Sequence, residues 1–292
     1  MIHGDKDKFL KVLNQVAMRT GFVLPLLEKD YYLTLIISRI HRLSKDLIFK
    51  GGTCLNKIYF SYYRLSEDLD FSMRLPEYTV TRSVRRRCIQ PVKDNIEELA
   101  EDLGMKIDDT ENPGHNESRQ YIFYFIFQSL VLPQESRIKL EIGLRFNTLC
   151  PPVEREVRHK FLHSFTEQPL FNAGKINCLD INELIAEKIR AAATRRLIAP
   201  RDFYDIDYVL RNGFEISSPA LMDLLKKKLA EDNAATDLSK YSINLGRTDD
   251  EIRDMKSRIK EELFDVLTTD ERKCFDIDIA LKRINLAMRT LA

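Results

Sequence analysis

Hydrophobic and polar positions change their period several times in the first part of the chain. Apolar residues recur at helical spacing over residues 9–17 and 26–40. A short apolar run at 47–49 ends at two glycines, which indicates a buried strand that enters a tight turn. Residues 53–63 then fit a helix capped by its first residue, and residues 68–73 alternate polar and apolar positions as a half-buried strand does.

The pattern then changes from mixed to helical. A helical segment at 84–103 and a loop at 105–119 precede two β-rich runs, at 121–128 and 137–145. From about Asp180 the spacing is helical to the end of the sequence. The helices predicted there cover residues 180–196, 200–211, 221–230, 251–267 and 277–291. We therefore expect an α+β domain over residues 1–165, with helices before the first strand, and an all-helical domain over residues 166–292.

Composition narrows the class of protein. The 292 residues carry 46 Lys and Arg against 45 Asp and Glu, a net charge of +1, which excludes a protein that coats nucleic acid by bulk charge. No apolar run reaches the roughly 18 residues that span a bilayer, and the N-terminal residues lack the apolar core of a signal peptide. Five widely spaced cysteines without a CxxC pair indicate reduced thiols, so we expect a cytoplasmic protein without membrane contact.

Two carboxylates in the predicted strand at 68–73 are the first candidates for chemistry. Residues i and i+2 of a strand point to the same face, so Asp68 and Asp70 project together while Leu69 and Phe71 are buried behind them. Two adjacent carboxylates repel each other unless a cation lies between them, and hard oxygen ligands select Mg²⁺ or Mn²⁺. The alternative is a pair of unrelated surface acids, because Asp-x-Asp alone is common.

The glycine pair before this strand adds a second feature. Gly51 and Gly52 lie between a strand and a helix, where the backbone can approach a phosphate and the helix N-terminus offers N–H donors. A phosphate cradle with a metal-binding acid pair is what two-metal transfer of a nucleotidyl group requires. Glu141 is the candidate for a third metal ligand, on a strand face shared with Arg137 and Lys139. With those neighbours, Glu141 alternatively forms only surface ion pairs.

Several linked motifs together resemble a known family. They are Glu28-Lys29-Asp30-Tyr31-Tyr32, Phe49-Lys50-Gly51-Gly52-Thr53, Arg64-x-Ser66-x-Asp68-Leu69-Asp70-Phe71, Glu187-Lys188-Ile189-x-Ala191, and Arg195 followed by Pro200-Arg201-Asp202-Phe203-Tyr204-Asp205-Ile206. These motifs resemble the AbiEii family of bacterial nucleotidyltransferase toxins, which includes the MenT proteins and belongs to the DNA polymerase beta-like superfamily. The resemblance implies a nucleotidyltransferase-type mixed β-sheet flanked by helices, with a helical C-terminal domain that contributes to the nucleotide cleft.

The resemblance also implies roles for individual residues. Ser66 and Asp68 belong to the nucleotide and metal motif, Asp70 is the second metal acid, and Lys188 contacts the triphosphate. Asp205 completes the site from the helical region. The spacing after Lys188 is slightly longer than the family pattern, so Asp202 is an alternative to Asp205. The nucleotide-binding residues that we expect are Lys50, Gly51, Gly52, Thr53, Ser66, Lys188, Arg195 and Arg201.

The function that follows is Mg²⁺-dependent transfer of a nucleoside monophosphate from an NTP to an acceptor hydroxyl. By resemblance, the acceptor is the 3′ end of tRNA, and the protein is the toxin of a toxin–antitoxin or abortive-infection system with a cognate antitoxin. One alternative acceptor is a protein hydroxyl or a small molecule such as an antibiotic, which the near-neutral net charge favours. Another alternative is a nucleotide-binding module without turnover.

Overall fold

The structure is a computed structural model that describes residues 1–78 and 80–289. The chain divides into two compact units, Met1–Leu179 and Asp180–Ala292. The division falls beyond the boundary expected at residue 165, because two short strands, β7 (Val153–Glu156) and β8 (Lys175–Cys178), still belong to the sheet of the first unit. The sequence gives little signal for these strands, since each has only four residues and charged side chains.

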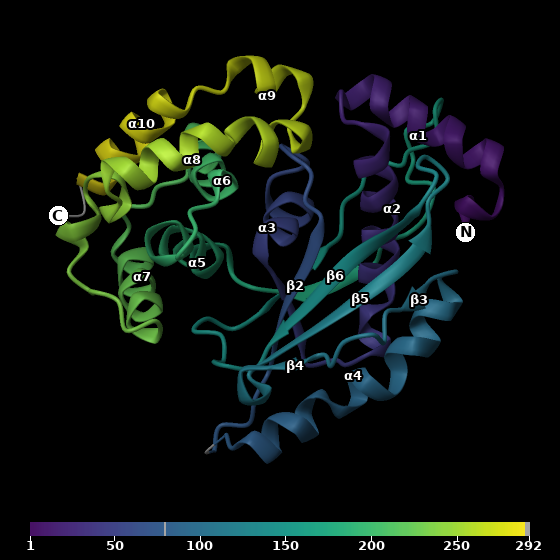
Figure 1. Ribbon diagram of the computed structural model, residues 1–292, viewed down its shortest axis with the longest axis horizontal. Helices are drawn as coiled ribbons and strands as arrows, with labels where there is room; N and C mark the ends of the chain where they lie inside the picture. Colours follow the sequence, from purple (N-terminus) through teal and green to yellow (C-terminus); the bar gives the residue numbers. More distant parts are fainter. Residues whose placement is uncertain (79, 290–292) are drawn as a thin grey trace. The chain divides into compact units, whose positions relative to one another are not determined.

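The first unit is built on one mixed β-sheet of eight strands, in the order β3-β5-β6-β2-β1-β8-β7, with β4 paired to β5. The central strands β2 and β6 are parallel, and β1 and β2 are antiparallel. Figure 1 shows β2, β6 and β5 running side by side. The remaining bounds are β1 Leu47–Lys50, β2 Asp68–Met73, β3 Lys106–Ile107, β4 Gly114–His115, β5 Gln120–Gln128 and β6 Glu135–Gly143. The predicted α+β class is confirmed.

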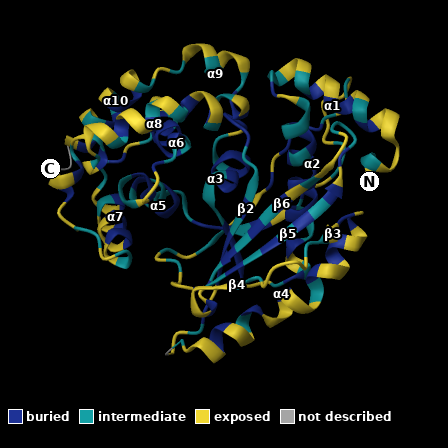
Figure 2. Ribbon diagram, in the orientation of Figure 1, coloured by how far each residue is buried: buried dark blue, intermediate teal, exposed yellow. Residues whose placement is uncertain are grey.

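Alternation along the long strands forms the core of the sheet. In β5 every second residue is buried. In β6 the apolar residues that alternate with Lys139 and Glu141 are buried in the same way. The buried members are Tyr121, Phe123, Phe125, Phe127, Ile138, Leu140 and Ile142. Figure 2 shows this burial along the strands. The opposite face of β6 is thereby left for polar side chains.

The helices of the first unit are α1 (Lys6–Thr20), α2 (Leu24–Arg39), α3 (Gly51–Cys54) and α4 (Arg82–Asp102). The helix predicted at 53–63 is wrong in extent, because α3 begins at Gly51 and continues only as a π-helix, Leu55–Tyr59. The chain then turns through Ser61 and Tyr62, both with positive φ. The expected loop at 105–119 contains the two-residue strands β3 and β4.

The second unit is helical in its described part. Its helices are α5 (Ile181–Thr194), α6 (Pro200–Arg211), α7 (Pro219–Glu231), α8 (Asp249–Glu262), α9 (Thr269–Cys274) and α10 (Ile277–Arg289). The single helix predicted at 251–267 is wrong, because α8 ends at Glu262 and a 3₁₀ turn, Phe264–Val266, follows. The predicted end at 291 lies outside the described residues. Among those residues, no helix is long and apolar enough to cross a membrane.

Candidate active site

The acid pair lies on β2, as the alternation predicts. Asp68 and Asp70 are half-buried, whereas Leu69 and Phe71 between and beyond them are fully buried. The two carboxylates therefore share one face of the strand. This face is the polar side of the central part of the sheet.

The neighbouring strands place charged residues directly beside Asp70. Lys50 of β1 is its antiparallel partner, and Glu141 of β6 is its parallel partner. Residues paired in this way point to the same face, so Lys50, Asp70 and Glu141 form a row across three strands. Asp68 pairs in the same register with Lys139. The structure thus brings together all three acids that were predicted as metal ligands.

The glycine turn touches this row. Gly51 has a φ of +76°, which favours glycine, and a Cβ there would collide with the Asp70 carboxylate. A Cβ on Gly52 would lie 2.6 Å from Nη2 of the buried Arg64 and 3.5 Å from Oγ of Ser66. Both positions therefore require glycine, because neighbouring side chains lie too close to the backbone for a Cβ. The turn lies against β2, the strand that carries Asp68 and Asp70.

Thr53 does not cap a helix, which corrects the sequence-based expectation. It lies inside α3, is buried, and its hydroxyl donates a hydrogen bond to the backbone carbonyl of Asp68 at 2.5 Å. This bond joins α3, which begins at the glycine turn, to the start of β2. Thr53 therefore acts on the geometry of Asp68 through the backbone.

Glu141 contacts one residue that the sequence analysis did not identify, Gln120, and one that it did, Lys139. Its carboxylate accepts a hydrogen bond from Nε2 of Gln120 at 2.7 Å and one from Nζ of Lys139 at 3.1 Å. The same Lys139 ammonium lies 3.8 Å from Oδ2 of Asp68. The ion pair expected from the alternative interpretation of Glu141 is therefore present. Lys139 links two of the three acids, Glu141 and Asp68.

The environment of Asp70 changes the pKa of its carboxyl group. Burial in the first place, and then the neighbouring charge of Glu141, raise its pKa to about 6 from the ordinary value of 3.8. Lys50 and Lys139 act in the opposite direction without cancelling the effect. A carboxyl group with a raised pKa beside other acids is typical of a functional site, because ordinary structural acids are paired.

In the second unit, the predicted triphosphate lysine is held between the two competing acids. Nζ of Lys188 in α5 lies 2.9 Å from Oδ1 of Asp202 and 2.9 Å from Oδ2 of Asp205, both in α6. Asp202 and Asp205 are three residues apart on a helix, so they share a face, and both side chains are buried. Asp205 and Asp202 are therefore equivalent in their contact with Lys188.

Arg195 and Arg201 are the two arginines predicted to bind phosphate. Arg195 lies on the connection between α5 and α6, and Arg201 lies just after this connection. Nη1 of Arg195 is 3.1 Å from Oδ2 of Asp202, although 55% of the Arg195 side chain is exposed. Arg201 lies in the first turn of α6 and is half-buried. An arginine that is both paired and exposed can exchange a carboxylate partner for a phosphate.

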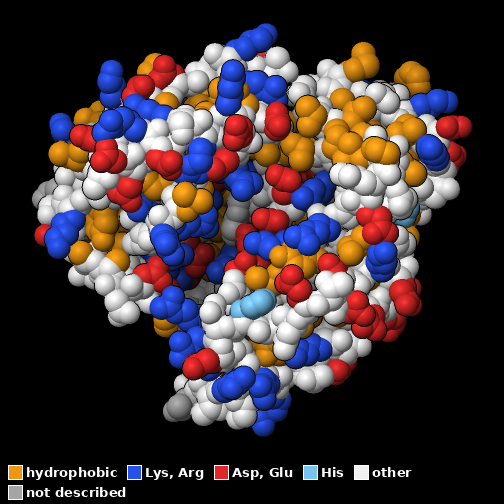
Figure 3. All heavy atoms as spheres, viewed as in Figure 1, with side chains coloured by type: hydrophobic (Ala, Val, Ile, Leu, Met, Phe, Trp, Pro, Cys, Tyr) orange, Lys and Arg blue, Asp and Glu red, His pale blue; other side chains and the backbone are white. Residues whose placement is uncertain are grey.

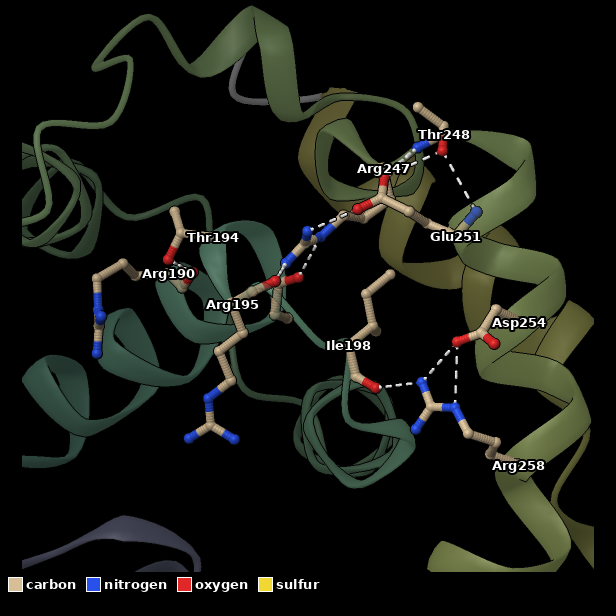
Figure 4. A network of polar contacts seen from close by, with 10 residues as sticks. Arg190, Thr194, Arg195, Ile198, Arg247, Thr248, Glu251, Asp254 and Arg258 are labelled. Atoms are coloured by element: carbon tan, nitrogen blue, oxygen red, sulfur yellow. Dashed lines mark hydrogen bonds and ion pairs between the residues drawn. The ribbon is translucent and has the colours of Figure 1, made fainter.

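Two further arginines brace this connection (Figure 4). Arg247 donates from Nε to the carbonyl of Ala192 at 2.8 Å and from Nη2 to the carbonyl of Arg195 at 2.7 Å. Arg258 of α8 donates from Nη2 to the carbonyl of Ile198 at 2.8 Å. These bonds satisfy carbonyls at the C-terminal end of α5 and before α6, which a helix end leaves without intrahelical partners. They fix the backbone that joins Lys188 to Asp202 and Asp205.

Comparison with known proteins decides the family. The sequence profile of the family described as nucleotidyl transferase AbiEii toxin, type IV TA system, matches residues 36–282. The chain belongs to the AbiEii family. It is therefore a nucleotidyltransferase of the toxin–antitoxin class, as the resemblance of its motifs implied. None of the curated proteins compared matches the chain.

Solved structures share the fold of this AbiEii protein. The nucleotidyltransferase toxin MenT4 of Mycobacterium tuberculosis superimposes with a TM-score of 0.58 at 15% identity, over 96% of this chain and 98% of that chain. JHP933 of Helicobacter pylori superimposes with a TM-score of 0.55 at 16% identity, over 92% of this chain and 93% of that chain. The architecture is thus retained over both units at low sequence identity.

The acids fit a divalent cation in chemistry but do not enclose one. Asp68, Asp70 and Glu141 offer the carboxylate oxygens that Mg²⁺ and Mn²⁺ prefer, and burial together with the charge of Glu141 raises the pKa of Asp70. However, no group of three His, Cys, Asp or Glu side chains in the described part of the chain is arranged to hold a metal ion. The ammonium of Lys139 instead lies against two of the carboxylates.

Proposed function

We propose that this AbiEii-family enzyme transfers a nucleoside monophosphate from an NTP to an acceptor hydroxyl and releases pyrophosphate, with Mg²⁺ or Mn²⁺ bound by Asp68, Asp70 and Glu141. The observation that carries the proposal is the row of Lys50, Asp70 and Glu141 across three strands, with the Gly51 turn against Asp70. When bound, the divalent cation would activate the acceptor hydroxyl and stabilise charge on the triphosphate.

The residues of the chain itself bind and orient the nucleotide. We assign the backbone N–H groups of the Gly51-Gly52 turn to the phosphate oxygens, with Ser66 beside Gly52. Lys50 supplies positive charge next to Asp70. We assign Lys188 to the triphosphate, because a compact ammonium suits a phosphate, with Arg195 and Arg201 as further phosphate ligands. Asp205, with Asp202 as the alternative, orients Lys188.

We assign the acceptor as the 3′ end of tRNA in the cytoplasm, where the enzyme acts as the toxin opposed by a cognate antitoxin, with abortive infection as its setting. The resemblance of the sequence motifs supports the acceptor, and the family description supports the toxin role. All five cysteines lie in the described residues and are free thiols, which is consistent with a reducing compartment.

Incubation of the purified protein with Mg²⁺, total tRNA and each of the four labelled NTPs in turn tests this function. We expect one or more NTPs to label RNA near the size of tRNA, with release of an equal amount of pyrophosphate. No label should be incorporated into RNA when EDTA is present from the start. If no NTP labels RNA, the tRNA acceptor is wrong.

A second acceptor class has one specific observation in its favour. The net charge is only +1, and acidic and basic side chains are interspersed over most of the face in Figure 3, which does not favour a large polyanion. Label on a protein or on a small product, with none on RNA, would show this alternative. Membership of a nucleotidyltransferase family argues against a module without turnover.

A further inference from the structure

Lys139 is a cation inside the carboxylate cluster that the proposed mechanism does not use. The cluster consists of Asp68, Asp70 and Glu141. Nζ of Lys139 lies 3.1 Å from Oε2 of Glu141 and 3.8 Å from Oδ2 of Asp68. It also lowers the pKa of Asp70 by its charge. One ammonium therefore interacts with every acid that we assign to the divalent cation.

The backbone gives Lys139 little freedom to be elsewhere. It lies in the middle of β6, which is paired with β5 on one side and β2 on the other. In the parallel pair it stands directly opposite Asp68, two residues before Glu141. Only the four-carbon stem of the side chain can move, and that stem is flexible enough to carry the ammonium away without disturbing the strand.

A divalent cation and this ammonium compete for the same oxygens. A metal ion binds carboxylate oxygens at about 2 Å, whereas an ammonium needs about 2.8 Å, so a metal ion on Oε2 of Glu141 and Oδ2 of Asp68 would take the place that the ammonium of Lys139 now holds, 3.1 Å and 3.8 Å from these atoms. Their charges also repel each other. Lys50 and Lys139 compensate two of the three carboxylate charges, so one negative charge remains. A divalent cation brings two positive charges, which is more than this remaining charge.

We propose that Lys139 is a displaceable counter-ion of the carboxylate cluster, so that the divalent cation binds by exchange with its ammonium. The inference rests on the proposed function, since it takes the cluster as the metal site. The displaced ammonium needs a new acceptor, and the phosphate oxygens of an NTP supply one. Metal and nucleotide therefore favour each other's binding, by the same factor in both directions.

Titration of the full-length protein with Mn²⁺ alone, at fixed ionic strength and without nucleotide, tests the exchange. The variants are Lys139→Met, which keeps the length of the side chain without its charge, and Lys139→Arg, which keeps the charge. Lys106→Met is the matched control, because Lys106 is an exposed lysine on another strand that pairs with Glu135. We expect Lys139→Met to bind Mn²⁺ about tenfold more tightly than the wild type. Lys139→Arg and Lys106→Met should stay within about twofold.

The readout separates this inference from the proposed function. Binding of Mn²⁺ is measured without any transfer reaction, so inactivity on a given acceptor does not affect it. Unchanged or weaker Mn²⁺ binding by a folded Lys139→Met variant overturns the exchange. If Lys139→Met instead only raises the KM for NTP, Lys139 is a phosphate ligand and not a counter-ion. If Mn²⁺ binds no better to the wild type than to Asp68→Asn, both the exchange and the proposed metal site are wrong.

Discussion

The carboxylate cluster of the first unit and the Lys188 cluster of the second unit differ in how far their charges are balanced. In the first, three half-buried acids face Lys50 and Lys139, and the pKa of Asp70 remains raised to about 6. In the second, Lys188 is held at 2.9 Å by each of two buried acids, and Arg195 neutralises the remaining charge. We therefore expect an added cation to stabilise the first cluster, whereas the charges of Lys188, Arg195, Asp202 and Asp205 in the second cluster already balance.

This difference predicts opposite responses to substitution. Removal of an acid from the first cluster relieves repulsion, so it should harm chemistry and spare the fold. Removal of Lys188 from the second cluster takes an ion-pair partner away from two buried carboxylates, so it should harm both the chemistry and the fold. Measuring activity and stability in the same variants therefore shows whether the two clusters have the roles that we propose.

The largest expected effect is on transfer in Asp68→Ala. We expect the rate to fall by about three orders of magnitude or more, because a carboxylate that we assign to the divalent cation is lost. The free energy of unfolding should change by less than about 1 kcal/mol, since Asp68 is half-buried and the ammonium of Lys139 lies 3.8 Å from its carboxylate. Labelled NMP incorporation and urea denaturation measure the two quantities. A variant that keeps a tenth of the activity or more would remove Asp68 from the metal site.

The next effect is that of Lys188→Ala. We expect a loss of about 3 kcal/mol in the free energy of unfolding, because the buried carboxylates of Asp202 and Asp205 both lose the ammonium that lies 2.9 Å from them. Transfer should be impaired as well, through a higher KM for NTP, a lower kcat or both. Thermal unfolding and steady-state kinetics on the same preparation measure the two effects.

The contrast between Asp202→Asn and Asp205→Asn sharpens this test. Both substitutions leave Lys188 one carboxylate, so their effects on stability should be similar, and only the functional acid should change the kinetics. We expect the larger loss of activity in Asp205→Asn. Unchanged steady-state kinetics in Lys188→Ala would show that the second cluster is only structural.

A smaller effect, of opposite sign, is expected on stability in Asp70→Asn. The pKa of Asp70 is raised to about 6, so the folded state holds this proton more tightly than the unfolded state does. The stabilising effect of the proton is complete below the ordinary pKa of 3.8 and is lost as the pH rises to about 6. Asparagine avoids that loss, so the variant should gain about 1–2 kcal/mol relative to the wild type at pH 7.5 and not at pH 4.

Urea denaturation at both pH values, without divalent cations, measures this gain. Asp109→Asn, at an exposed carboxylate in the loop after β3, is the matched control and should show no such pH-dependent difference. Equal stability of the wild type and Asp70→Asn at pH 7.5 would mean that the first cluster is not strained by charge. The contrast between the two clusters would then fail.

The sequence was sufficient for features that depend on neighbours along the chain. Alternation over residues 68–73 correctly predicts β2 and the shared face of Asp68 and Asp70, because a strand has a period of two. The glycine turn at Gly51 follows in the same way from the end of an apolar run. The family motifs consist of such local patterns, so the fold class could also be predicted.

Features that depend on pairing over long distances could not be predicted. The register that sets Asp70 beside Glu141 joins strands that are some seventy residues apart, and no local pattern specifies it. The contact of Gln120 with Glu141 follows from that register, as does the contact of Lys139 with Asp68. Lys139 was visible on the face of Glu141, but only the neighbouring strand shows that it reaches a second acid.

The smallest effect that we predict concerns Arg247, which stabilises the second cluster from outside it. Its side chain is 7% exposed and donates to the carbonyls of Ala192 and Arg195. Arg247→Ala leaves both carbonyls without this donor, which should cost about 1–2 kcal/mol in local stability. Hydrogen exchange should therefore speed up at the C-terminal end of α5 and the N-terminal end of α6, and remain unchanged in the sheet of the first unit.

The matched control for this variant is Arg253→Ala in α8. Arg253 is 75% exposed and pairs with the exposed Asp250, so its loss should change exchange by less than about twofold. If Arg247→Ala leaves exchange unchanged, the ion pairs of Lys188 with Asp202 and Asp205 hold α5 and α6 together without help. If exchange rises across the whole second unit, Arg247 stabilises the unit as a whole. Only a local increase supports a brace that sets the separation of α5 and α6 on which the Lys188 contacts depend.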